Sequence, residues 1–95
     1  MTLTTHNQLQ LLYDILTEQK EECSGSISEY QLIKRQVQAV MANDSVRNEQ
    51  LLRLLPEIYN YGRQGEVAQN DEEHIVTNAE NINKWLNAID QTSSE

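Results

Sequence analysis

The chain has 95 residues, a formal net charge of −8 and an apolar fraction of 38%. This length suits one domain with a modest core and leaves little material to enclose a deep substrate cavity. Seven basic residues scattered among fifteen acidic ones exclude the basic footprint that binds nucleic acid or an anionic membrane surface. We therefore expect a single helical domain over residues 1–95, frayed at 1–4 and 91–95, with neither nucleic acid nor membrane as a partner.

The cysteine content and the N-terminus indicate the compartment. Cys23 is the single cysteine, so no internal disulfide can form and a reducing environment is expected. Residues 1–6 lack the basic start and apolar core of a signal peptide. The longest apolar stretches fall far short of the ~20 residues that span a bilayer. The sequence predicts a cytoplasmic protein.

The first predicted helix covers residues 5–20. Thr5 and Gln8 match a capping box, in which a hydroxyl caps the first turn and an amide reaches back to it. Cys23-Ser24-Gly25 then breaks the helical pattern. Residues three and four apart share one face of a helix, and this spacing predicts the following core positions: Leu9, Leu12, Tyr13 and Leu16.

The second predicted helix opens with another capping box, formed by Ser26 and Glu29. Asn43 is expected to end it in the left-handed conformation. One apolar stripe predicts the core positions of this helix: Tyr30, Ile33, Val37, Val40 and Met41.

The third predicted helix combines the broadest apolar face with an internal proline. Asp44 or Ser45 is the expected cap. Pro56 removes a backbone donor and clashes with the preceding turn, at ~3 kcal/mol or more inside a helix. We expect a kink or break there, with a last turn reaching Tyr61 and the segment Gly62–Gly65 ending the helix. The apolar face comprises Leu51, Leu52, Leu54, Leu55, Ile58 and Tyr59.

The fourth predicted helix has the clearest helical period. Asn70 or Asp71 caps it, and acidic residues occupy the first turn, where the helix dipole favours negative charge. Glu80 and Lys84 match an i,i+4 ion pair on the outer side. The apolar positions are Ile75, Val76, Ala79, Ile82, Trp85, Leu86 and Ile89.

No segment alternates apolar and polar residues as a strand does, so an all-α fold is expected. Short connectors between amphipathic helices imply antiparallel neighbours. The sequence predicts a small antiparallel up-down four-helix bundle whose third helix is kinked or broken at Pro56.

The residues that commonly carry chemistry are sparse. His6, His74 and Cys23 fall short of the roughly four spaced ligands of a zinc site. Cys23 follows two glutamates at a helix end, where both the charges and the dipole disfavour a thiolate. We expect no metal, no cofactor and no enzymatic activity, although His74 with Glu73 is an alternative acid–base pair.

Four acidic side chains form a stripe on the first predicted helix: Asp14, Glu18, Glu21 and Glu22. Like charges four residues apart repel, at about 0.2–0.5 kcal/mol per pair, and the stripe ends at the negative end of the dipole. Local rules broken without compensation can mark functional sites, which favours docking of a basic partner. The alternative is a solvated face that keeps an acidic protein in solution.

The aromatic residues divide between core and surface. Tyr30, Tyr59 and Trp85 lie on or beside the apolar stripes and are expected in the core. Tyr61 follows the predicted kink, so we expect it to be exposed and to join the docking surface.

Three runs carry a family resemblance: Cys23-Ser-Gly-Ser-Ile-Ser-Glu29, Gln31-Leu-Ile-Lys-Arg35 and Leu55-Pro-Glu-Ile-Tyr-Asn-Tyr-Gly62. With Gly65, His74-Ile75 and Trp85, the chain resembles the YtzH-like family of short proteins from Bacillus and its relatives, over nearly its whole length. The Pro-Glu-Ile-Tyr-x-Tyr stretch is the most distinctive part. The resemblance implies a soluble cytoplasmic protein and carries over no catalytic or binding residues.

Two functions remain open. The preferred one is a non-catalytic protein–protein interaction module that binds a protein partner or itself as a homodimer, because a thin bundle leaves apolar surface uncovered. The alternative is a small-molecule-binding regulatory bundle, with the ligand between helices near Pro56 and Tyr59.

Overall fold

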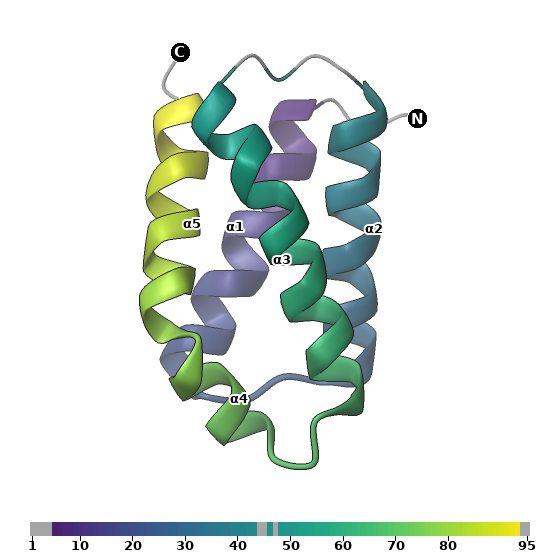
Figure 1. Ribbon diagram of the computed structural model, residues 1–95, viewed down its shortest axis with the longest axis vertical. Coiled ribbons are helices and arrows are strands. Elements are labelled where there is room, and N and C mark those ends of the chain that lie inside the picture. The colour runs from purple at the N-terminus through teal and green to yellow at the C-terminus, as the bar shows by residue number, and fades with distance from the viewer. Residues whose placement is uncertain (1–4, 44–45, 47, 94–95) are drawn as a thin grey trace.

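The computed structural model describes residues 5–43, 46 and 48–93, and these form five α-helices (Figure 1). The helices are α1 (Thr5–Glu22), α2 (Ile27–Asn43), α3 (Glu49–Val67), α4 (Asp71–Thr77) and α5 (Ala79–Ser93). This part of the chain contains no strand, which confirms the all-α prediction. Four helices were expected, and the described residues form five because the fourth predicted helix is divided into α4 and α5.

The long helices surround a common core. In Figure 1, α2 and α5 lie on either side of the molecule, α3 lies in front and α1 lies behind. Helix α1 packs against both α2 and α5, and α3 packs most extensively against α2. The short helix α4 closes one end and contacts α1 and α5.

Most of the predicted core positions are buried in one continuous cluster. Three were predicted wrongly: Met41, Leu52 and Val76 are 50%, 42% and 57% exposed. Tyr13 and Tyr59 are partly buried against the edge of the cluster. The physical reason is that a packed helix buries a stripe little more than about 100° wide, and these side chains lie at or beyond its margin.

Helix α3 runs through Pro56 without a break, so the break, one of the two predicted outcomes, was wrong, and the kink stays a prediction. Leu52 and Pro56 are both exposed, so the carbonyl that loses its helical donor lies on the side of the helix that faces water. Leu55 and Ile58, on either side of the proline, are fully buried. Their burial holds the chain helical where local propensity alone favours a break.

The two glycines of α3 bring two helices together instead of ending one. Both are buried, and α3 continues two residues beyond Gly65. A Cβ atom on Gly62 would lie 3.1 Å from the carbonyl oxygen of Tyr30, and one on Gly65 would collide with the Tyr30 ring. Only residues without a side chain allow α2 to approach α3 this closely.

The helix ends follow the predicted capping chemistry in part. Ser26 Oγ accepts the backbone N–H of Glu29 at 3.2 Å, which confirms that cap. Cys23 takes the left-handed conformation (φ 52°) after α1. Asn48 caps α3 through the N–H of Leu51 at 3.2 Å. The candidates Asp44 and Ser45, and the side chains of Thr5 and Asn43, lie outside the described parts of the chain.

A break at Asn78 separates α4 from α5. Asn70 caps α4 as predicted, through the N–H of Glu73 at 3.0 Å. The side-chain amide of Asn78 donates to the His74 carbonyl at 2.8 Å and ends α4 by satisfying one of its last acceptors. The break turns the expected fourth helix into two.

We predict that Gly65→Ala destabilises the fold by roughly 1–3 kcal/mol, the usual cost of overpacking a filled core. The sign is informative, because Gly→Ala inside a helix otherwise stabilises by roughly 0.5–1 kcal/mol. Urea denaturation measures the free energy of unfolding. Arg63→Ala, an exposed change on the same helix, is the control and should stay within about 0.5 kcal/mol of the native chain. A Gly65→Ala chain as stable as the native one would contradict the packing role.

Candidate interaction surfaces

The acidic stripe predicted on the first helix is accessible on α1. Asp14, Glu18, Glu21 and Glu22 are all exposed. Asp14 Oδ1 accepts a hydrogen bond from Gln10 Nε2 at 3.0 Å. The ion pairs seen among the described residues, Lys34–Glu66 and Lys84–Glu57, lie on other helices. Neither Lys34 nor Lys84, the basic residues of these pairs, therefore neutralises a carboxylate of the stripe.

Tyr61 was predicted to be exposed beside this surface, and that prediction was wrong. Its side chain is 2% exposed, and its hydroxyl donates to Gln19 Oε1 at 2.7 Å. Because α3 is unbroken, Tyr61 follows Ile58 by three residues and keeps its direction into the core. It therefore belongs to the packing and not to a docking surface.

A buried polar chain joins three helices around Tyr61. Gln19, on α1, is fully buried, and its Nε2 donates to Glu29 Oε1 on α2 at 3.3 Å. The ring of Tyr61 stacks on His74 at 4.7 Å, and the edges of Tyr30 and Trp85 complete the cluster. The arrangement fixes α1, α2, α3 and α4 relative to one another.

The buried hydroxyls of this cluster resist ionisation. Burial, and next the proximity of Tyr30, raise the pKa of Tyr61 well above its ordinary value of 10.0. Burial, and next the negative charge of Asp71, raise the pKa of Tyr30. Both hydroxyls therefore stay protonated at pH values where an exposed tyrosine begins to ionise.

Two of the residues considered for catalysis or metal binding, His74 and Cys23, have structural partners. His74 Nε2 donates to the Tyr61 carbonyl at 3.1 Å, and Cys23 Sγ lies 3.7 Å from the Lys20 carbonyl. Within the ranges that the structure describes, no three His, Cys, Asp or Glu residues gather as a metal site. In the same ranges, no helix combines the length and apolar character needed to cross a bilayer.

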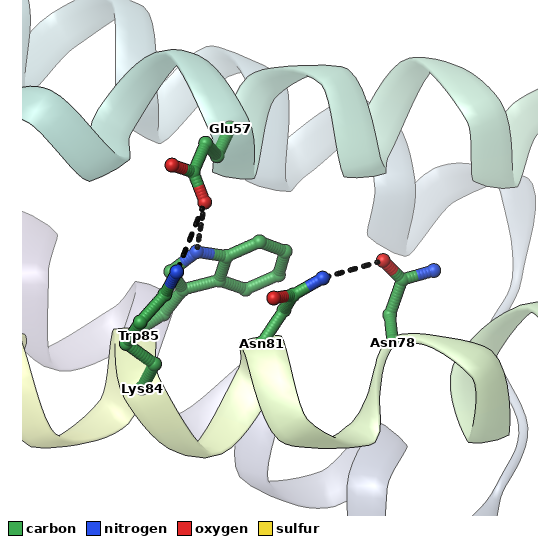
Figure 2. A network of polar contacts seen from close by, with 5 residues as sticks. All are labelled: Glu57, Asn78, Asn81, Lys84 and Trp85. Carbon is green, nitrogen blue, oxygen red and sulfur yellow. Dashed lines mark hydrogen bonds and ion pairs between the residues drawn. The ribbon is translucent and has the colours of Figure 1, made fainter.

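Between α3 and α5 lies a shallow polar depression of about 200 Å³. Figure 2 shows Glu57 reaching from α3 to α5, where it accepts from Trp85 Nε1 at 3.4 Å and lies 3.6 Å from Lys84 Nζ. The expected Glu80–Lys84 pair is thus replaced by a contact between helices. Asn81 Nδ2 donates to Asn78 Oδ1 at 3.4 Å beside it. The two contacts of Glu57 hold α3 to α5.

A more apolar groove of about 290 Å³ lies between α2 and α3, lined by Gln38, Met41, Pro56, Tyr59 and Asn60. Gln38 Nε2 donates to the Tyr59 hydroxyl across it at 3.4 Å. Met41 of α2 and Pro56 of α3 line the same groove, whereas Tyr30 lies against Gly65 farther along the two helices.

Two rows of residues contain the groove-lining Gln38, Met41, Pro56 and Tyr59 and continue beyond the groove along α2 and α3, and we name them together the α2–α3 seam. Each row has the three- and four-residue spacing that keeps side chains on one side of a helix. On α2 the row is Ile27, Gln31, Lys34, Gln38 and Met41, and on α3 it is Leu52, Pro56, Tyr59, Arg63 and Val67. Sequence reasoning missed this seam because it assigned Met41 and Leu52 to the core. The polar residues Gln31 and Gln38, at the same phase as Met41, were the available signal.

We predict that Tyr61→Phe costs about 1–3 kcal/mol at neutral pH, because it leaves the buried Gln19 acceptor without a donor. Above pH 10 the unfolded Tyr61 ionises while the folded one stays protonated, so the native chain loses stability as pH rises past that value. Tyr61→Phe should lose less over the same range. Urea denaturation at neutral pH and above pH 10 measures both effects.

The matched control for this experiment is Tyr59→Phe, which removes a half-buried hydroxyl at the groove. It should change stability little and keep the alkaline loss of the native chain. Equal pH profiles for Tyr61→Phe and the native chain would contradict the assignment of the alkaline loss to Tyr61.

Comparison with known proteins agrees with the resemblance in the sequence. The profile of the family described as "YtzH-like protein" matches residues 3–89. The chain is 28% identical over 93 residues to "Uncharacterized protein YtzH" of Bacillus subtilis (strain 168), covering 98% of this chain and all of that protein. No solved structure matches the chain significantly. The chain belongs to the YtzH-like family.

Proposed function

We propose that this protein is a non-catalytic protein–protein interaction module that docks a partner through the α2–α3 seam. One observation carries the proposal. Of the five large apolar side chains exposed in the described parts of the chain, four belong to the seam: Ile27, Met41, Leu52 and Val67. Apolar side chains that gather on one surface within a polar rim are typical of protein interaction sites.

The proposal includes the antiparallel up-down arrangement expected from the short connectors. In its support, Figure 1 shows α1 ending and α2 beginning at the end of the bundle that α4 closes, whereas α2 ends and α3 begins at the opposite end. This arrangement leaves α2 and α3 as neighbours with one shared outer side, so the seam is a continuous surface. The lone cysteine favours the cytoplasm as the place where the module acts.

The chemistry-bearing residues support a non-catalytic role. The imidazole of His74 is stacked on Tyr61 and donates to its carbonyl, so it serves the packing of α4 on α3. The neighbouring Glu73 lies in the first turn of α4, where negative charge stabilises the helix dipole. Both residues thus have structural tasks.

The acidic stripe on α1 is a second contact in this proposal, suited to a basic partner. Its carboxylates are exposed and spaced so that they repel one another. A basic surface would relieve that repulsion and add favourable long-range attraction.

We predict that the double change Asp14→Lys and Glu18→Lys abolishes capture of a basic partner. Immobilised native and variant chains, incubated with lysate of the source organism, allow the bound proteins to be quantified by mass spectrometry. The amount of a basic protein bound to the variant should be about tenfold or more below the amount bound to the native chain, because attraction becomes repulsion at short range.

The matched control is Glu49→Lys with Glu80→Lys, which changes the net charge equally at exposed positions outside the stripe. It should retain the basic protein. Capture that survives the α1 reversal would discard the stripe as a docking site.

The second candidate function is a small-molecule-binding regulatory bundle, favoured by the groove beside Pro56 and Tyr59. Its volume is near the lower end of the ~300–1,000 Å³ that ligand pockets occupy. A ligand that binds only the folded chain raises the melting temperature. A thermal shift by a metabolite that Tyr59→Ala abolishes would favour this function over protein docking.

A further inference from the structure

We infer that the partner at the α2–α3 seam is a second copy of this chain, bound across a two-fold axis. This inference rests on the proposed function, which makes the seam a docking surface, and it adds the identity of the occupant. Three features of the described residues carry it: the distribution of charge over the helices, the order of apolar and polar groups along the seam, and the size of the surface.

The charge distribution favours a second copy at this surface above any other. Helices α2 and α3 together carry four basic and four acidic side chains, whereas α1, α4 and α5 carry two basic and nine acidic ones. Two copies that meet through the acidic helices repel each other. Two copies that meet through α2 and α3 bring together the helices without net charge, and the acidic helices then lie farthest apart.

The order of groups along the seam is self-complementary. Ile27 and Val67 occupy one end, Met41 and Leu52 occupy the other, and Lys34 with its partner Glu66 lies between them. A two-fold axis through the middle places the apolar end of one copy on the opposite apolar end of its partner. In such an isologous contact both copies use the same surface patch, so association stops at a dimer.

The size of the seam sets the strength of the contact. Met41 lies fourteen positions after Ile27, which corresponds to about 21 Å along the helix at 1.5 Å per residue. Two adjacent helices, each about 10 Å wide, make a face about 20 Å wide, so each copy offers about 400 Å², roughly half of what a stable interface buries on each partner. We therefore expect a weak dimer with a dissociation constant in the range of roughly 10 μM to 1 mM, as small interfaces show.

The occupied middle of the seam limits other partners. Lys34 is paired with Glu66, and Gln38 is bonded to Tyr59, so these groups offer little charge to a strongly basic or acidic protein. Arg63 is the other charged side chain of the two rows, so a partly apolar surface with few charges is the complement that remains, and the seam itself has that character. Another protein of the same chemistry is a distinct outcome of the experiment below.

The test is sedimentation equilibrium of the full native chain up to about 1 mM, the upper limit of the expected dissociation constant. The variant Met41→Glu adds a charge to the seam, and Val76→Glu adds the same charge to α4, at another exposed apolar residue. The native chain and Val76→Glu should rise from 11.0 kDa towards twice that mass. Met41→Glu should associate about tenfold more weakly, because a two-fold contact carries the change twice. Circular dichroism melting checks that both variants fold.

Three results would overturn the second copy as partner. These are a native chain that stays monomeric, association that Met41→Glu leaves unchanged, and a mass that grows beyond two chains. The proposed function is judged separately, by the lysate capture already described. If the native chain is monomeric but Met41→Glu loses a captured protein that Val76→Glu keeps, the seam is a docking surface for another protein. If both variants keep every captured protein, the docking role of the seam fails as well.

Discussion

The close approach of α2 and α3 is the constraint on which the rest of the bundle depends. The ring of Tyr30 rests against the backbone at Gly65, where no other residue type fits. Beside it, the hydroxyl of Tyr61 reaches Gln19 on α1 through a buried hydrogen bond. Unsatisfied polar groups are costly in a core, so the bond restricts how α1 docks on the α2–α3 pair. The Tyr30–Gly65 contact and the Tyr61–Gln19 hydrogen bond together select one packing of the helices, whose apolar faces alone would allow several.

The same constraint creates the candidate interaction surface. Because α2 and α3 pack more extensively on each other than on any other helix, the side chains at the outer margins of their core stripes lie on one shared side of the pair. Met41 and Leu52 are exposed at one end of the seam. In a chain with a net charge of −8, α2 and α3 are also the helices in which acidic and basic residues balance. Apolar exposure and electrostatic neutrality coincide there, which is why we place the partner on the seam.

Periodicity was sufficient for the positions of the long helices and for most of the core, because both follow from which residues lie three and four apart. It failed at Pro56, because the local cost of ~3 kcal/mol for a proline inside a helix was considered without the packing of the neighbouring residues. In the folded chain, Leu55 and Ile58 are buried on either side of that residue and keep α3 continuous. The error then carried to Tyr61, whose expected exposure depended on a break that does not exist.

An all-α fold, the helix caps at Ser26 and Asn70, and the acidic stripe on α1 were readable from residue types and spacing, since each depends on groups within one or two turns. Tertiary structure alone decided what depends on distant neighbours. It paired Glu57 with Lys84, buried Tyr61 against Gln19, and left Met41 on the surface. The physical reason is that a helical stripe specifies which side faces inward but not which helix it meets. The edge of the core, and so the surface left for a partner, is set only when the helices pack.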